Sequence, residues 1–197
     1  MELFFLLICI LQISLVIGHG YLKCPSPEFK PGTRSKGGMA AHIMDKDIFP
    51  SLKLKNQKSK SDRDHNLAAF HKLFNNGKNG KYKTVRELVD AFRPDCANTD
   101  EKVAPRNVSE CAPKNHFIFG NELGGHTIGF QKHHIGPCEA WIDDKRVFYD
   151  ADCITNFQSK PGQYAKIPID YSSCKGNCVF RFYWAALHFQ KVQMFSK

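Results

Sequence analysis

Hydrophobic residues at helical spacing predict two helices in the first half of the chain, after a glycine- and proline-rich stretch, residues 19–38, that we expect to be extended and irregular. Ser61 is the expected N-cap of the first helix and Gly77 its expected stop. The second helix opens with a capping box, Thr84-Val85-Arg86-Glu87, and ends at Pro94. The apolar positions are Leu67, Phe70, Leu73 and Phe74 in the first helix, and Val85, Leu88, Val89 and Phe92 in the second.

The second half of the chain has short apolar runs typical of strands. These runs cover residues 116–119, 127–130, 139–142, 146–149, 164–169 and 178–188. Asp143-Asp144-Lys145 is the expected turn of a hairpin, and Pro168 would confine its strand to a sheet edge. In the last run, Phe180, Phe182 and Trp184 alternate onto one face. The pattern predicts a mainly β protein, an antiparallel β-sandwich with a helical insertion in its first half.

The first 18 residues have the features of a secretory signal peptide. Phe4–Ile17 is almost entirely apolar, but a stable membrane span needs about 20 such residues. Val16 and Gly18 are small residues in the positions that precede a signal-peptidase cut. We therefore expect cleavage before His19, and a single extracellular domain over residues 19–197 that is monomeric and not bound to membranes.

Of the eight cysteines, only Cys9 would be lost with this segment, which leaves an odd number for an oxidising compartment. Asn107-Val108-Ser109 is a glycosylation acceptor, consistent with secretion. The chain has a formal charge of +9, with many lysines in residues 53–60. That run is either a solvated loop or a surface that attracts a polyanion. No nucleic-acid-binding motif is present, so an acidic polysaccharide or lipid is the more suitable partner.

A histidine at the start of a mature chain can bind a metal through both its ring and its free amine. Gly20, the next residue, has no side chain to crowd such a metal. A second imidazole would complete a site of three nitrogen ligands, which favours Cu(II). Within residues 126–138, His134 is the strongest candidate because the rigid sequence Gly136-Pro137-Cys138 follows it closely.

The stretch GFQKHHIGPCEAWID, residues 129–143, resembles the second-histidine segment of the lytic polysaccharide monooxygenases, most closely the oomycete group, auxiliary activity family seventeen. Three further stretches are similar to that group, residues 96–99, 170–178 and 181–188. The resemblance implies one copper ion, cycling between Cu(II) and Cu(I), on an immunoglobulin-like or fibronectin-like β-sandwich. It also implies an external reductant, O₂ or H₂O₂, and oxidative cleavage of pectic homogalacturonan.

Carried onto this sequence, the resemblance makes His19 and His134 the copper ligands. Gln193 and His188 would orient a bound oxygen species through hydrogen bonds. Family members have a tyrosine near the axial position of the copper, in a Gln-x-Tyr pattern. Here the pattern ends in Phe195, which has no hydroxyl group.

The resemblance also implies the disulfides Cys24–Cys111, Cys138–Cys153 and Cys174–Cys178. Similar proteins have a further cysteine three positions after the axial residue, which here would directly follow Lys197. We therefore hypothesise that the chain is a fragment or an unusual gene model, and that Cys96 has lost this partner.

Other functions remain open at this point. One is a non-catalytic protein that binds copper or a glycan and keeps the two histidines, which the phenylalanine at position 195 would suit. A zinc hydrolase using His126, His133 or His134 is less well supported, because the sequence has no HExxH motif. Acidic residues are plentiful enough for a paired-carboxylate glycosidase, but no motif indicates one.

Overall fold

The computed structural model describes most of the chain beyond the expected signal peptide. The described residues are 20–33, 41–44, 53–75, 81–92, 98–100, 104–105, 108–109, 111–123, 125–130, 134–188 and 191–196. The predicted signal peptide, His19, His133, Cys96 and Asn107 lie outside them. So do Gly77 and Pro94, the predicted ends of the two helices.

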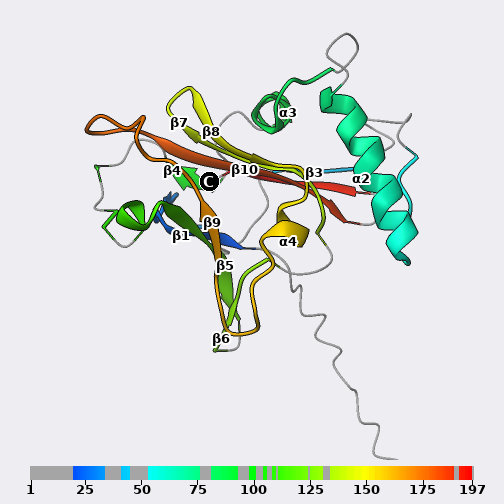
Figure 1. The fold of residues 1–197 in the computed structure, drawn as a ribbon, viewed down its shortest axis with the longest axis horizontal. Coiled ribbons are helices and arrows are strands. Elements are labelled where there is room, and N and C mark those ends of the chain that lie inside the picture. Colours follow the sequence, from blue (N-terminus) through cyan, green and yellow to red (C-terminus); the bar gives the residue numbers. More distant parts are fainter. Residues whose placement is uncertain are drawn as a thin grey trace, which may run out of the picture.

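The protein is mainly β, as predicted, with antiparallel sheets and three α-helices in the described part (Figure 1). The larger sheet has five strands in the order β3-β11-β10-β7-β8. They span Ala41–Met44 (β3), Lys191–Ser196 (β11), Phe180–His188 (β10), Cys138–Ile142 (β7) and Lys145–Asp150 (β8). The long aromatic strand predicted from the sequence, β10, is at its centre.

The second sheet is built around β5, which pairs with β1, β6 and β9. Its strands span Tyr21–Cys24 (β1), His116–Leu123 (β5), His126–Ile128 (β6) and Ala165–Pro168 (β9). Among the described strands β9 pairs only with β5, which confirms the edge position expected from Pro168. A small two-stranded ladder joins β2, Glu28–Phe29, to β4, Thr99–Asp100.

An aromatic core joins the two sheets. Phe182 and Trp184 of β10 are fully buried, and so are Phe117 and Phe119 of β5. The ring centroids of Phe117 and Phe182 are 5.1 Å apart, and those of Phe119 and Trp184 are 5.7 Å apart. The ring centroid of Phe180 is 5.5 Å from that of Phe117, so Phe180 packs against the same core. The predicted alternation of aromatic residues along this strand is therefore confirmed.

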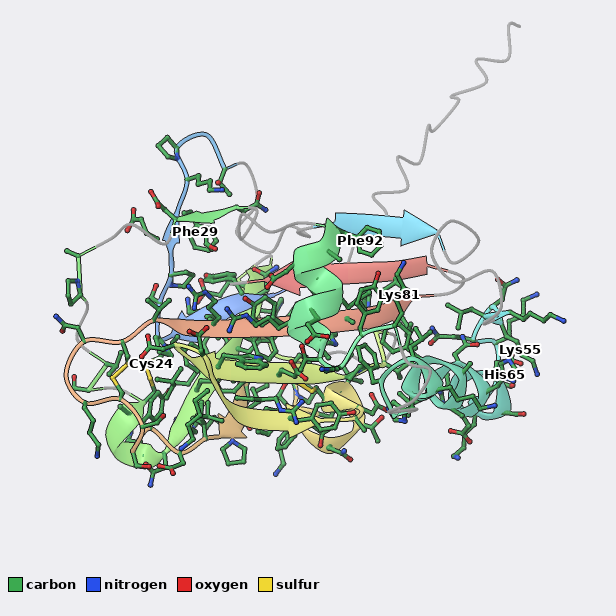
Figure 2. The ribbon with its side chains drawn as sticks, turned by 90° about the horizontal axis from the view of Figure 1, so that it is seen from above. Cys24, Phe29, Lys55, His65, Lys81 and Phe92 are labelled. Carbon is green, nitrogen blue, oxygen red and sulfur yellow. A yellow bond between two sulfur atoms is a disulfide. The ribbon has the colours of Figure 1, made fainter. Side chains whose placement is uncertain are left out.

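The opposite face of β10 is also buried, because α3, Val85–Phe92, lies across the larger sheet (Figure 2). Val85, Leu88 and Val89 are completely buried there, as predicted. Phe92 is 38% exposed, so its predicted place on the apolar face was wrong. The amide of Glu87 donates to the Thr84 hydroxyl at 2.9 Å, which confirms the capping box.

The other α-helices are α2, Lys60–Asn75, and α4, Cys153–Asn156, with a short 3₁₀ turn, η1, at Ala112–Lys114. Ser59 caps α2, not Ser61 as predicted. The Ser59 hydroxyl accepts from the amide of Asp62 at 3.1 Å, and the Asp62 carboxylate accepts from the amide of Ser59 at 3.3 Å. This reciprocal pair is a capping box that begins at Ser59, two residues before the predicted cap.

Several boundaries differ from the predictions. Three strands, β1 to β3, lie in or just after the stretch expected to be irregular. The β7–β8 hairpin has a two-residue loop, Asp143-Asp144, because Ile142 pairs with Lys145. Asp143 has a positive φ of 51°, which short polar residues tolerate in tight turns.

All three predicted disulfides are present: Cys24–Cys111, Cys138–Cys153 and Cys174–Cys178. Disulfides persist in oxidising compartments such as the extracellular space. Among the described residues, no helix has the length and hydrophobicity that crossing a membrane requires.

Candidate functional site

The end of β10 brings most of the predicted site residues together. Ile135 forms an antiparallel bridge with Leu187, and the Leu187 amide donates to the Ile135 carbonyl at 2.6 Å. Cys138 pairs with Trp184 in the same register. Carried one residue beyond Ile135, this register places His134 opposite position 188. Positions 134 and 188 therefore each adjoin the bridged pair Ile135–Leu187 at this end of the sheet.

The backbone next to His134 is tightly fixed. Gly136 has φ +140°, and a Cβ atom built on it would lie 2.2 Å from the Ala185 carbonyl oxygen. Only glycine fits so close to β10. The amide of Cys153 donates to the Gly136 carbonyl at 3.2 Å, and the Cys138–Cys153 disulfide joins the same two segments. The rigid turn predicted after His134 is thus present.

Asp152 adds a partly buried acceptor to this turn. Its carboxylate accepts from the amide of Gly136 at 3.2 Å and from the Thr155 hydroxyl. Burial raises the pKa of the Asp152 carboxyl above its ordinary value, although these hydrogen bonds act in the opposite direction. Asp152 was not singled out from the sequence, and only its position just before Cys153 could have drawn attention to it.

The His134 side chain is buried, with 2% of its surface exposed. Its ring lies against Trp184, with the two centroids 6.1 Å apart and the planes inclined at 51°. Trp184 in turn contacts Phe119 and Phe130. The ring of His134 is therefore held by the aromatic core that joins the two sheets.

Strand β11 brings the remaining predicted positions to the same face of the sheet. Gln193 pairs with Ala186, and Phe195 pairs with Trp184. Directly opposed residues of an antiparallel pair share a face, and so do alternate residues of one strand. Positions 188, 193 and 195 therefore lie on the face that carries Trp184 and His134.

Gly20 connects the start of β1 to this cluster. A Cβ atom built on Gly20 would lie 2.8 Å from the Phe119 ring, so the backbone at residue 20 is in close contact with that ring. Phe119 touches Trp184, and Trp184 touches His134. His19 itself lies outside the described residues, but its neighbour Gly20 contacts Phe119, a member of the aromatic cluster that holds His134.

Glu139 is a buried carboxylate on the opposite face, beneath α3, and the sequence reasoning did not single it out. It accepts hydrogen bonds from Arg146 Nη1 at 2.9 Å, Trp141 Nε1 at 3.0 Å and the Arg86 amide at 3.2 Å. Three donors surround it, so it stabilises the packing of α3 on β7 rather than acting as a catalytic acid. The sequence feature that could have identified Glu139 is a charged residue within an otherwise apolar predicted strand.

A separate cavity of about 590 Å³ lies at the other end of β10. Phe180, Arg181 and Tyr171 line it, together with the Cys174–Cys178 loop. It includes none of the predicted site residues. The predicted site is therefore distinct from the large cavity, at the opposite end of the central strand.

The zinc alternative gains no support from the described residues. His126 is exposed on β6, and His133 lies outside the described part. In the part of the chain that the structure describes, no three His, Cys, Asp or Glu side chains gather where they could hold a metal. A site formed by His19 and His134 would have only two such residues, and His19 lies outside the described part.

No protein-family model matches the sequence. A search of curated proteins gave no match either.

Proposed function

We propose that the protein is a secreted, copper-dependent polysaccharide monooxygenase. In this proposal the amine and ring of His19 and the ring of His134 hold one copper ion. The substrate is an acidic polysaccharide, homogalacturonan, and an external reductant with O₂ or H₂O₂ completes the reaction. The two sheets joined by the aromatic core would then form the immunoglobulin-like sandwich that the resemblance implies.

One observation carries the proposal. His134 and Gly20 contact a single aromatic cluster, through Trp184 and Phe119 respectively. The positions His188, Gln193 and Phe195 lie on the same face of the sheet. Gly20, Phe119, His134 and the β10–β11 strand pair are far apart in the sequence but are linked by contacts through this cluster. This combination supports a copper site built on a chain terminus.

His134, the proposed ligand that the structure describes, is chemically suited to a copper ion. Cu(II) prefers nitrogen ligands such as imidazole and amine groups, whereas calcium and magnesium prefer oxygen ligands. The His134 ring is held by Trp184 and by the turn at Gly136, so little rotamer freedom remains to be lost on binding. When bound, copper would supply the one-electron chemistry that lets O₂ or H₂O₂ oxidise a C–H bond at the glycosidic linkage.

The protein's own residues would then have separate roles. His134 would orient its ring toward the metal, and His188 and Gln193 would hydrogen-bond an oxygen-bearing ligand. Phe195 would close the site with an apolar ring and exclude water from that side.

A second function has one observation in its favour. Phe195 pairs with Trp184 in the place where similar enzymes have a tyrosine, so no phenol group is available there. A protein that holds copper or binds a glycan without oxidising it would suit this substitution.

Product analysis distinguishes the two functions. The mature chain with a free His19 terminus is loaded with copper, given ascorbate, and incubated with pectin, cellulose and chitin. Oxidised oligosaccharides from pectin, detected by mass spectrometry, are the expected result. His134→Ala is the matched control and should release none. Copper binding without any oxidised product, in a correctly processed sample, would favour the non-catalytic function.

A further inference from the structure

The strongest unassigned feature is a basic surface beside the predicted site. We define the basic segment as residues 53–60, which contain four lysines and no acidic residue. Lys53, Lys55, Lys58 and Lys60 are all exposed. Lys60 pairs with Asp64 at 2.7 Å and Lys55 lies 4.0 Å from Asp62, whereas Lys53 and Lys58 form no ion pair with a described carboxylate. The segment therefore keeps a net positive charge.

This segment has a defined shape. The Asn66 side chain is fully buried and bonds the Lys55 backbone twice, accepting from its amide at 2.7 Å and donating to its carbonyl at 2.8 Å. Leu54 is 3% exposed and belongs to the hydrophobic core. The Ser59 cap joins the segment to α2. The lysines thus project from a fixed backbone and not from a loose loop.

The segment is attached directly to the strand end that carries the predicted site. Gln57 Nε2 donates to the Leu187 carbonyl at 2.6 Å, and Leu187 pairs with Ile135, the neighbour of His134. Figure 2 shows Lys55 and His65 at the end of the molecule opposite Cys24. The basic segment therefore contacts the strand end that leads into position 188.

We propose that the basic segment is the docking surface that holds an acidic polysaccharide across the predicted site. This inference rests on the proposed function for the identity of the anion. Lysine ammonium groups attract the carboxylates of a uronate chain, and a row of them beside the site raises the local concentration of such a chain. The attraction acts at the surface, so it weakens as salt shortens the Debye length to about 8 Å at 0.15 M.

The structure favours a polysaccharide over a membrane or a nucleic acid. Elements that bind membrane surfaces place large apolar side chains beside their lysines. The large hydrophobic residues exposed in the described part are Phe92, Tyr149 and Val179, and none lies in the basic segment or α2. Single-stranded nucleic acids are held by stacking on exposed aromatic rings, and the described residues of these two elements expose no Phe, Tyr or Trp ring.

The test measures binding without oxidation, so that it stands apart from the proposed activity. The copper-free mature chain is titrated with polygalacturonate, with fully methyl-esterified pectin, and with vesicles of phosphatidylcholine and phosphatidylserine. The variant combines Lys53→Glu, Lys55→Glu and Lys58→Glu. Its matched control makes the same charge change at three exposed lysines elsewhere, Lys145→Glu, Lys166→Glu and Lys175→Glu.

We expect wild type to bind polygalacturonate more tightly than the esterified polymer, with affinity that falls as salt rises. The basic-segment variant should lose at least tenfold in affinity, and the control less than threefold. Equal losses in both variants, or none in either, would overturn the proposal. Tighter binding to the vesicles, lost in the same variant, would assign the surface to lipid instead. If binding is as expected but the activity assay gives no oxidised products, the proposed enzymatic function is contradicted and the docking surface is supported.

Discussion

The indole of Trp184 packs against the imidazole of His134, with their ring centroids 6.1 Å apart. Trp184 is also fully buried among aromatic residues of both sheets. One residue therefore supports the core and the predicted metal ligand together, and its replacement should affect both.

Replacing Trp184 with alanine should lower the free energy of unfolding by about 3–5 kcal/mol, because a large buried ring is removed. Urea denaturation at neutral pH measures this change. Tyr149→Ala is the control, since Tyr149 is 41% exposed and its loss should cost only about 0.5 kcal/mol. Equal costs for the two variants would show that Trp184 does not support the core as described.

Gly136→Ala should be far more harmful than Gly162→Ala. Both glycines have positive φ values, +140° and +76°, so alanine is strained at each by about 1 kcal/mol. A Cβ atom at Gly136 would also lie 2.2 Å from the Ala185 carbonyl oxygen, whereas one at Gly162 meets nothing within 4 Å. We expect Gly136→Ala to cost at least about 3 kcal/mol in a denaturation experiment. Similar stabilities for both variants would contradict the close approach of this turn to β10.

Arg146→Met should destabilise the protein by about 1–3 kcal/mol, because buried Glu139 loses a charged hydrogen-bond donor. Lys145→Met, one residue earlier on β8 and exposed, should change stability by less than about 0.5 kcal/mol. Thermal unfolding compared at one pH measures the difference. No difference between these two variants would mean that water, and not Arg146, satisfies Glu139.

Asp152 predicts a specific dependence of stability on pH. Its pKa is raised by burial above the ordinary 3.8, so the folded protein binds more protons than the unfolded chain between those two pKa values. Its contribution to stability is present below pH 3.8 and is lost as the pH rises through the folded pKa. Asp152→Asn can keep the acceptor for Gly136 but does not titrate. The stability of this variant relative to wild type should therefore increase from pH 4 upward, and a decrease would contradict the sign.

Local features of the fold could be predicted from the sequence. The Thr84 capping box and the alternation of Phe182 with Trp184 depend on neighbouring residues, so their patterns are visible in one segment. The Ser59 cap was misplaced by two residues, because Ser61 satisfies the same preference and only the bond to Asp62 decides between them. Phe92 was assigned to the buried face because periodicity does not show where a helix leaves its sheet.

Long-range contacts could not be predicted in the same way. Strand β1 lies in a stretch rich in glycine and proline, and it is stabilised by pairing with β5, far along the chain. The contact of Gly20 with Phe119 has no sequence pattern. The proximity of His134 to position 188 was expected only through the resemblance. In the structure it follows from the pairing of their neighbours Ile135 and Leu187.

Copper binding by the chain terminus tests the central claim most directly. Two forms of the mature protein are compared, one beginning at His19 and one with a single extra glycine ahead of it, which turns the His19 amine into an amide. Titration calorimetry gives the affinity for Cu(II), and electron paramagnetic resonance reports the nitrogen ligands. We predict a three-nitrogen signal for the native terminus, and at least a hundredfold weaker binding with an altered signal for the extended form. Equal affinities and identical spectra would contradict a site built on His19.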